Sequence, residues 1–169
     1  MTSRRRLARS RIPGTTGTRT PAHGSETSDE PTLAGSAEAL PALLLDTTVL
    51  IDALRGRAAA DRLRALRSVS DPPYVCAINV EELWRGARAT EEAAVRRLLR
   101  GLRTAGLGDE EGERAGRWRR DFATRGVTLS QADCLIAAAA VAVRARLATG
   151  NPSDFPMPEL VVEHWPVGA

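Results

Sequence analysis

Four acidic residues stand at or just beyond the ends of predicted strands, where carboxylates can do chemistry. Asp46 directly follows a short apolar run, and Glu82 lies one helical turn beyond a second one. Asp133 falls in the first turn of an Ala-rich segment, and Asp154 is five residues past another apolar run. Ligands of open α/β sheets bind at the carboxyl ends of strands, so these side chains can meet at one edge. Carboxylate oxygens without His or thiolate partners favour a hard cation, Mg²⁺ or Mn²⁺.

The lysine, histidine and cysteine content of the chain excludes several other kinds of catalytic or binding site. All 24 basic residues are Arg, which excludes a Walker A lysine, a Schiff-base lysine and a kinase-type lysine. His23 and His164 are the two histidines, too few for most His-based triads or His-rich zinc sites. Cys76 and Cys134 form no CxxC pair, and we expect them to pack as small apolar residues in a reducing compartment. The longest uncharged apolar run, 134–143, is too short to span a membrane.

Each acid also has a purely structural alternative. Asp46 can start a helix, and Asp154 can form an Asx turn before Phe155-Pro156. The spacing Ser130-x-x-Asp133 fits a capping box, and the spacing of Asn79 and Glu82 fits a looser one. The two roles are compatible, because a helix N-terminus stabilises an ionised carboxylate.

The elements that must position these acids alternate between strand and helix patterns. Alternation of this kind predicts an α/β fold with a short parallel sheet and helices on both faces. The predicted strands are 42–45, 74–78, 147–149 and 160–163, and the predicted helices are 48–55, 58–69, 79–87, 91–103, 110–125 and 130–146.

Residues 1–40 differ in kind from residues 41–169, which we expect to form a single folded domain. Gly, Pro, Ser and Thr make up 19 of these 40 residues, and all six Arg precede the first acid, Glu26. A segment with so little to bury is expected to be disordered. It is either an arm that attracts RNA or the product of a start placed too far upstream, and the abrupt beginning of the folded pattern at Pro41 favours the second.

Four strings in order resemble the PIN-domain family, and within it the VapC-type toxins of toxin–antitoxin pairs. They are LLLDTTVLIDALRG with Asp46, CAINVEELWRGA with Glu82, ADCLIAAAAV with Asp133 and LATGNPSDF with Asp154. VVEHW near the end is similar to the usual last strand of the family. The family often has an acid at position 151, where this chain has Asn. The fourth ligand is therefore Asp154, Asn151 through its amide oxygen, or neither.

The resemblance implies a PIN-like fold and a metal-dependent endoribonuclease. Asp46 and Asp133 would then be the principal Mg²⁺ or Mn²⁺ ligands, with Glu82 orienting the metal-bound water and Asp154 completing the charge. Supporting hydroxyls are expected from Thr48 and Thr149. A basic rim for the RNA is expected from arginines that follow the first two acidic motifs, with solvated helix faces as the alternative: Arg55, Arg57, Arg85 and Arg88.

The resemblance also implies partners. These are an RNA substrate, either tRNA or ribosomal RNA, and a cognate antitoxin that inserts a basic side chain among the acids, in a prokaryotic cytoplasm. Trp84 and the Leu98-Leu99-Leu102 stripe are either core residues or part of a homodimer face. The rival function is a PIN-like fold without catalysis that only binds RNA or protein. Phosphotransfer domains that also begin with a strand and an Asp are disfavoured, because position 48 is Thr and Lys is missing.

Overall fold

The computed structural model describes residues 42–66 and 71–168. The predicted disordered extension 1–40 and the end of the predicted helix 58–69 lie outside these residues. Within them, every helix is too short or too polar to cross a lipid bilayer.

A five-stranded parallel sheet forms the centre of the fold, in the order β3-β2-β1-β4-β5. Both the predicted α/β class and the parallel sheet are confirmed. The strands are β1 (Leu43–Leu45), β2 (Tyr74–Cys76), β3 (Arg103–Ala105), β4 (Arg146–Thr149) and β5 (Val162–His164).

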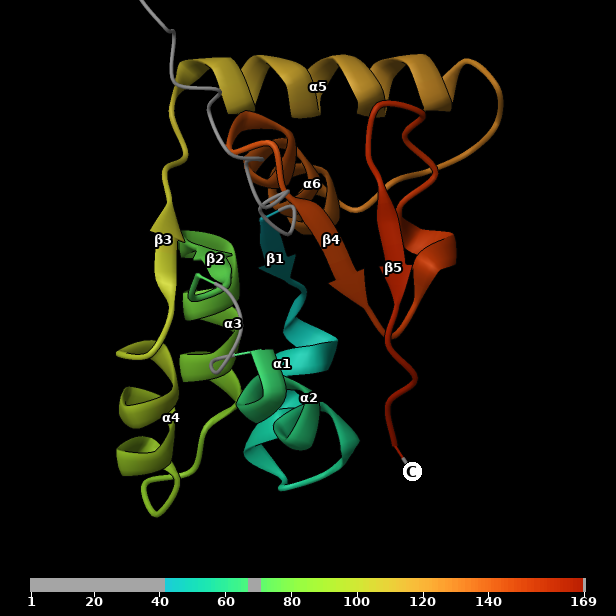
Figure 1. Ribbon diagram of the computed structural model, residues 1–169. Coiled ribbons are helices and arrows are strands. Elements are labelled where there is room, and N and C mark those ends of the chain that lie inside the picture. The colour runs from blue at the N-terminus through green and yellow to red at the C-terminus, as the bar shows by residue number, and fades with distance from the viewer. Residues whose placement is uncertain (1–41, 67–70, 169) are drawn as a thin grey trace, which may run out of the picture. The chain divides into compact units, whose positions relative to one another are not determined.

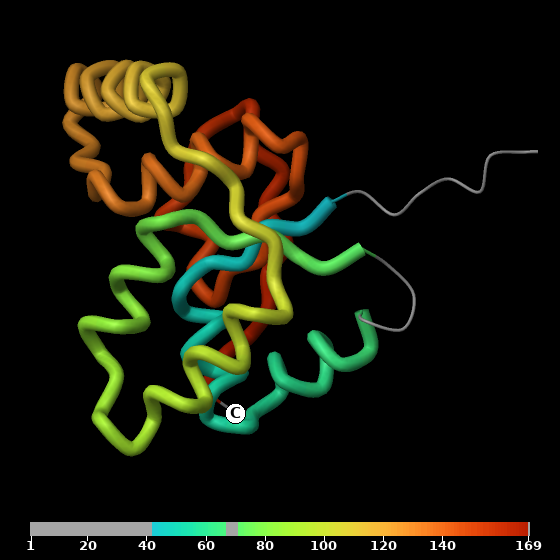
Figure 2. Tube along the Cα trace, turned by 90° about the vertical axis from the view of Figure 1, so that its left-hand side faces the viewer, coloured from blue at the N-terminus to red at the C-terminus, as the bar shows by residue number. Residues whose placement is uncertain are grey.

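Helices connect the strands and cover both faces of the sheet (Figure 1). Because successive side chains of a strand point to opposite faces, Leu44 packs with α5 and α6, whereas Leu43 and Leu45 pack with α1 to α4. The helices are α1 (Thr47–Leu54), α2 (Ala58–Leu66), α3 (Ala77–Gly86), α4 (Glu92–Leu99), α5 (Asp109–Ala123) and α6 (Gln131–Ala142), with a 3₁₀ turn η1 (Pro152–Asp154). Figure 2 shows α5 nearly end-on, well separated from α4.

The direction in which successive strands are added to the sheet reverses between β1 and β4. From β1 the chain continues to β2 and β3 on one side, while β4 and β5 lie on the other. Leu45 is in register with Ala148, so the residues that follow them, Asp46 and Thr149, leave the sheet side by side. In open parallel sheets this reversal point is where ligands bind.

Several predicted boundaries were wrong. The predicted strand 160–163 is β5, Val162–His164, and the predicted helix 110–125 ends at Ala123. The predicted helix 91–103 ends at Leu99, and its last residue, Arg103, begins the edge strand β3, where Arg103 N donates to Pro73 O at 2.8 Å. The predicted strand 74–78 stops at Cys76, and α3 begins at Ala77. The predicted helix 130–146 ends at Ala142, since Arg144 adopts a left-handed φ of 53° and breaks the helix before β4.

The buried side chain of Asp52, on α1, ties three segments together. Its Oδ2 accepts from Ala59 N at 3.2 Å, and its Oδ1 accepts from Gly168 N at 2.9 Å. Arg57 Nη1 lies 3.7 Å from Oδ1. The hydrogen bond from Gly168 is the largest influence on this carboxyl group and lowers its pKa, and the bond from Ala59 and the charge of Arg57 act in the same direction against desolvation.

We expect Asp52→Asn to lower the free energy of unfolding at pH 7 by about 2 kcal/mol, because charged hydrogen bonds at a buried site are lost. A folded-state pKa below the unfolded value of about 3.9 makes this contribution present above that pH and lost in acid. Urea unfolding from pH 7 to pH 3 therefore shows a wild-type advantage that shrinks on acidification. A constant difference across this range would contradict the assignment.

Candidate active site

Asp46 is held at the carboxyl end of β1 by donors on both of its carboxylate oxygens. It is 5% exposed and caps the N-terminus of α1, where Oδ1 accepts from Thr47 N at 2.7 Å. Oδ2 accepts from Thr48 Oγ1 at 2.6 Å and from Thr149 Oγ1 at 2.8 Å. These two hydroxyls occupy both lone-pair directions of Oδ2, so one direction remains on Oδ1. The structural role and the proposed ligand role therefore coexist in one side chain.

Glu82 reaches the same place from α3. Its Oε2 accepts from Thr47 Oγ1 at 2.5 Å, and that hydroxyl in turn accepts from Asn79 Nδ2 at 3.1 Å. Asn79 is fully buried, and its Oδ1 accepts from Cys76 N at 2.9 Å. Asn79 thus joins the end of β2 to the start of α1. Glu82 bonds across to α1, which is not the capping box considered for it.

Asp133 lies at the start of α6, half-buried, where Ser130 Oγ accepts from its backbone N at 3.3 Å. Burial raises the pKa of the Asp133 carboxyl group, while the hydrogen bond with Ser130 opposes this. The negative charges of Asp154, Asp46 and Glu82 raise the pKa further. All four acids singled out in the sequence therefore share one electrostatic environment, although they come from four separate segments.

Asp154 is the exposed member of this group. It ends η1, and its Oδ2 accepts from Asn151 Nδ2 at 2.6 Å. The amide oxygen of Asn151 in turn accepts from Ser153 Oγ at 2.8 Å. Both the amide nitrogen and the amide oxygen of Asn151 are thus hydrogen-bonded within its own turn. The negative charge of Asp154 raises the pKa of Asp133. Of these two side chains, Asp154 is the one that adds negative charge to the group.

The donor chemistry fits a divalent cation. The carboxylates provide hard oxygen ligands. Burial, and after it the charges of three neighbouring acids, raise the pKa of Asp133, so a cation beside it would be stabilising. Among the described residues, however, no three His, Cys, Asp or Glu side chains form a group that could hold an ion as they stand. The acids share an electrostatic field without reaching coordination geometry.

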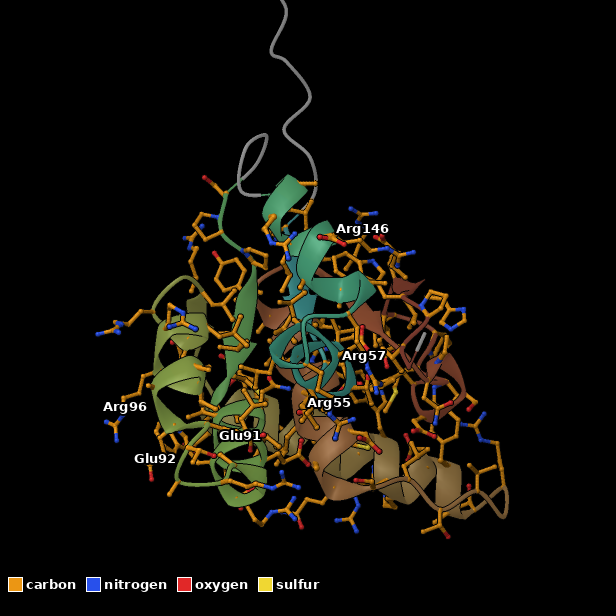
Figure 3. The ribbon with its side chains drawn as sticks, turned by 90° about the horizontal axis from the view of Figure 1, so that it is seen from below. Arg55, Arg57, Glu91, Glu92, Arg96 and Arg146 are labelled. Atoms are coloured by element: carbon orange, nitrogen blue, oxygen red, sulfur yellow. The ribbon has the colours of Figure 1, made fainter. Side chains whose placement is uncertain are left out.

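A hollow of about 220 Å³ opens beside Glu82, between α1, α3 and α4. Its apolar lining is interrupted by Arg55, Glu82 and Glu91. Figure 3 looks at this side of the molecule and labels Arg55 and Glu91.

The four arginines expected at the rim are not equivalent. Arg55 lines the hollow beside Glu82. Arg57 lies against Asp52, and Arg85 Nε is 3.2 Å from Glu81 Oε1 on the same helix. Arg88 is exposed.

Comparison with known proteins agrees with this arrangement. The PIN domain profile matches residues 43–155. This chain belongs to the PIN-domain family. Among curated proteins, no sequence matches it.

Several solved structures share the PIN fold of this chain. VapBC2 from Rickettsia felis, bound to a DNA fragment from its promoter, matches at 22% identity with a TM-score of 0.65, over 73% of this chain and 98% of the other. A toxin–antitoxin complex from Klebsiella pneumoniae matches at 28% identity with a TM-score of 0.58, over 72% of this chain and 96% of the other. DNA-bound VapBC from Salmonella typhimurium matches at 21% identity with a TM-score of 0.65, over 75% of this chain and 99% of the other. The predicted resemblance to the PIN-domain family is confirmed.

Sequence reasoning missed Thr47 and Asn79, which link Glu82 to the end of β1. Their one signal is position: each is a small polar residue within three places of a strand end. Trp84 and the Leu98-Leu99-Leu102 stripe are partly buried and pack against the core cluster of α1 to α4, and Arg96 stacks over the Trp84 ring at 4.8 Å.

Proposed function

We propose that this PIN domain is a Mg²⁺- or Mn²⁺-dependent endoribonuclease that acts as the toxin of a toxin–antitoxin pair in a prokaryotic cytoplasm. The observation that carries the proposal is that Asp46 and Glu82 both bond to the first turn of α1 at the reversal point of the sheet. Asp133 lies near them, because its pKa is raised first by burial and then by the charges of Asp154, Asp46 and Glu82. Carboxylates that repel one another at the reversal point of a parallel sheet form a site that a divalent cation would stabilise. The toxin–antitoxin structures with the same fold support the biological role.

Each residue has a distinct part in the proposed chemistry. Asp46 and Asp133 would hold the ion, and Glu82, fixed by Thr47, would orient water beside it. A bound Mg²⁺ or Mn²⁺ would lower the pKa of coordinated water and offset charge on the scissile phosphate. Thr48 and Thr149 hold Oδ2 of Asp46, which leaves Oδ1 as the oxygen with a lone pair for the ion.

The RNA must approach an acidic site, so cationic side chains are needed near it. Arg55 is the best placed, because it lines the hollow that Glu82 also lines. Arg88 is exposed in the turn before α4, while the pairing of Arg57 and Arg85 with acids reduces the charge that they offer. We assign phosphate contacts to Arg55 and Arg88 first.

The antitoxin is proposed to occupy the hollow between α1, α3 and α4. Its apolar lining suits apolar side chains of an extended or helical segment, and Glu82 offers a partner for a basic side chain. Occupation of this hollow would bring that basic group to the acids and block both the ion and the RNA. The proposed homodimer remains a separate prediction, which the native mass of the purified protein tests.

The direct test is to map new 5′ ends in total RNA after induced expression, and then to repeat the cleavage with purified protein. The proposal predicts discrete cuts in tRNA or ribosomal RNA that appear with Mg²⁺ or Mn²⁺ and disappear with EDTA. Uncut RNA under every divalent-ion condition would contradict it.

Two observations favour a second candidate, a PIN module that binds RNA or protein without cutting. The described acids form no ready metal group, and Asp154 is engaged by Asn151. This candidate predicts that the wild-type protein retains RNA in a filter-binding assay and leaves it intact in Mn²⁺.

A further inference from the structure

The last described residues, Trp165–Gly168, run from β5 across the end of the sheet that carries the site. Trp165 N donates to Thr149 O at 2.8 Å, and Gly168 N donates to Asp52 Oδ1 at 2.9 Å. In Figures 1 and 2 this tail leaves β5 and ends beside the turn between α1 and α2. The tail is therefore tied at one end to β4 and at the other to α1.

Between these two ties, Val167 lies directly on Gly150. A Cβ atom at Gly150 would be 2.6 Å from Val167 Cγ2 and 2.9 Å from Cγ1, closer than real Cβ contacts. The same Cβ atom would also lie 3.3 Å from Thr48 Oγ1. Only a residue without a side chain lets the tail come this close to the backbone that follows β4.

The backbone N–H groups of this turn orient the two threonine hydroxyls that hold Asp46. Gly150 N donates to Thr48 Oγ1 at 3.0 Å, and Asn151 N donates to Thr149 Oγ1 at 3.0 Å. Both hydroxyls then donate to Oδ2 of Asp46. Each hydroxyl thus accepts a hydrogen bond from a backbone N–H of the turn beneath Val167, and each donates a hydrogen bond to the same carboxylate oxygen.

We propose that Val167 and Gly150 are positioning residues for Asp46, and that the C-terminal tail holds the 149–151 turn in the conformation that aims both hydroxyls at Oδ2. The part of this inference that concerns ion binding rests on the proposed function. Groups that orient a metal ligand typically change metal affinity or activity 10- to 100-fold when they are altered. The tail acts on this orientation through the backbone, without touching the carboxylate.

The test compares full-length Val167→Ala with Val161→Ala, which shortens another exposed valine outside this contact. Gly150→Ala is a second route, since its methyl group pushes against Val167 from the other side. Mn²⁺ affinity is measured by electron paramagnetic resonance, kcat and KM on RNA by initial rates, and amide exchange at Gly150 and Asn151 by NMR. We expect Val167→Ala and Gly150→Ala to bind Mn²⁺ about tenfold more weakly, with lower kcat, unchanged KM for RNA and faster exchange at both amides. Val161→Ala should match the wild type.

The outcomes separate this inference from the proposed function. Wild-type Mn²⁺ affinity and wild-type amide exchange in both Val167→Ala and Gly150→Ala would overturn the positioning role while leaving the nuclease proposal intact. A wild-type protein that binds no Mn²⁺ would overturn the nuclease proposal. In that case amide exchange still decides the inference: faster exchange at Gly150 and Asn151 in the variants supports it, and unchanged exchange refutes it.

Discussion

Replacing either Asp46 or Asp133 by asparagine is expected to lower the rate of RNA cleavage by about a thousandfold. Each change removes one of the two principal anionic ligands, and a loss of about 4 kcal/mol in transition-state stabilisation corresponds to that factor. Initial rates at saturating Mg²⁺, on the RNA found by 5′-end mapping, measure the effect. Glu113→Gln is the matched control, because this exposed acid pairs with Arg117 on α5, away from the site. Equal rates for all four proteins would remove both acids from the mechanism.

The same two variants should change the stability of the metal-free protein in opposite directions. Asp46→Asn weakens a buried, triply hydrogen-bonded carboxylate and should cost about 1–2 kcal/mol. Asp133→Asn relieves a carboxylate whose pKa is raised by burial and by neighbouring acids, so it should stabilise the protein at pH 7. Because that folded-state pKa lies above the unfolded value, the wild-type penalty is missing in acid, grows as the pH rises from the unfolded pKa to the folded pKa, and is complete above it.

Thermal melts of the EDTA-treated proteins between pH 3 and pH 8 check this contrast. The melting temperature of Asp133→Asn should be higher than that of the wild type at pH 7 and equal to it at pH 3. A lower melting temperature for Asp133→Asn at pH 7 would show that Asp133 is a structural cap rather than a strained ligand.

Thr149→Val is expected to lower Mn²⁺ affinity and cleavage by about 10- to 100-fold. Thr149 is fully buried, and its hydroxyl bridges Asn151 N and Asp46 Oδ2, so valine of nearly equal shape removes the bridge and leaves both partners incompletely bonded. Thr149→Ser keeps the hydroxyl and is the matched control. Titration of each protein with Mn²⁺, followed by assay, measures the effect. Wild-type affinity in Thr149→Val would show that Thr48 alone suffices to orient Asp46.

Much of the site was predictable because its members sit at strand ends. An apolar run followed by Asp46 predicts a buried strand whose carboxyl end carries an acid, and the alternation of elements predicts a parallel sheet. Parallel strands bring their carboxyl ends to one edge, so Asp46 and Thr149, 103 residues apart, meet in a hydrogen bond. Local pattern and a general rule of topology together were enough for this pair.

What the sequence did not reveal depends on contacts between distant segments. The edge strand β3 buries Ala105 but exposes Arg103 and Thr104, so it lacks the apolar signal of a strand and forms by pairing with β2. The contact of Val167 with Gly150 has no local signature either, because a glycine after a strand is typical of any turn. Such contacts are set by packing, and neither residue's neighbours in sequence encode them.

The central claim is that these acids together bind a divalent ion. Anomalous diffraction from a crystal of the wild-type protein soaked in Mn²⁺ tests it most directly. The account predicts a manganese peak within bonding distance of Asp46 and Asp133, with Glu82 beside it, and no peak there in Asp133→Asn crystals soaked alike. Wild-type crystals with those carboxylates turned apart and no manganese between them, from a protein that still cleaves RNA in EDTA, would contradict it.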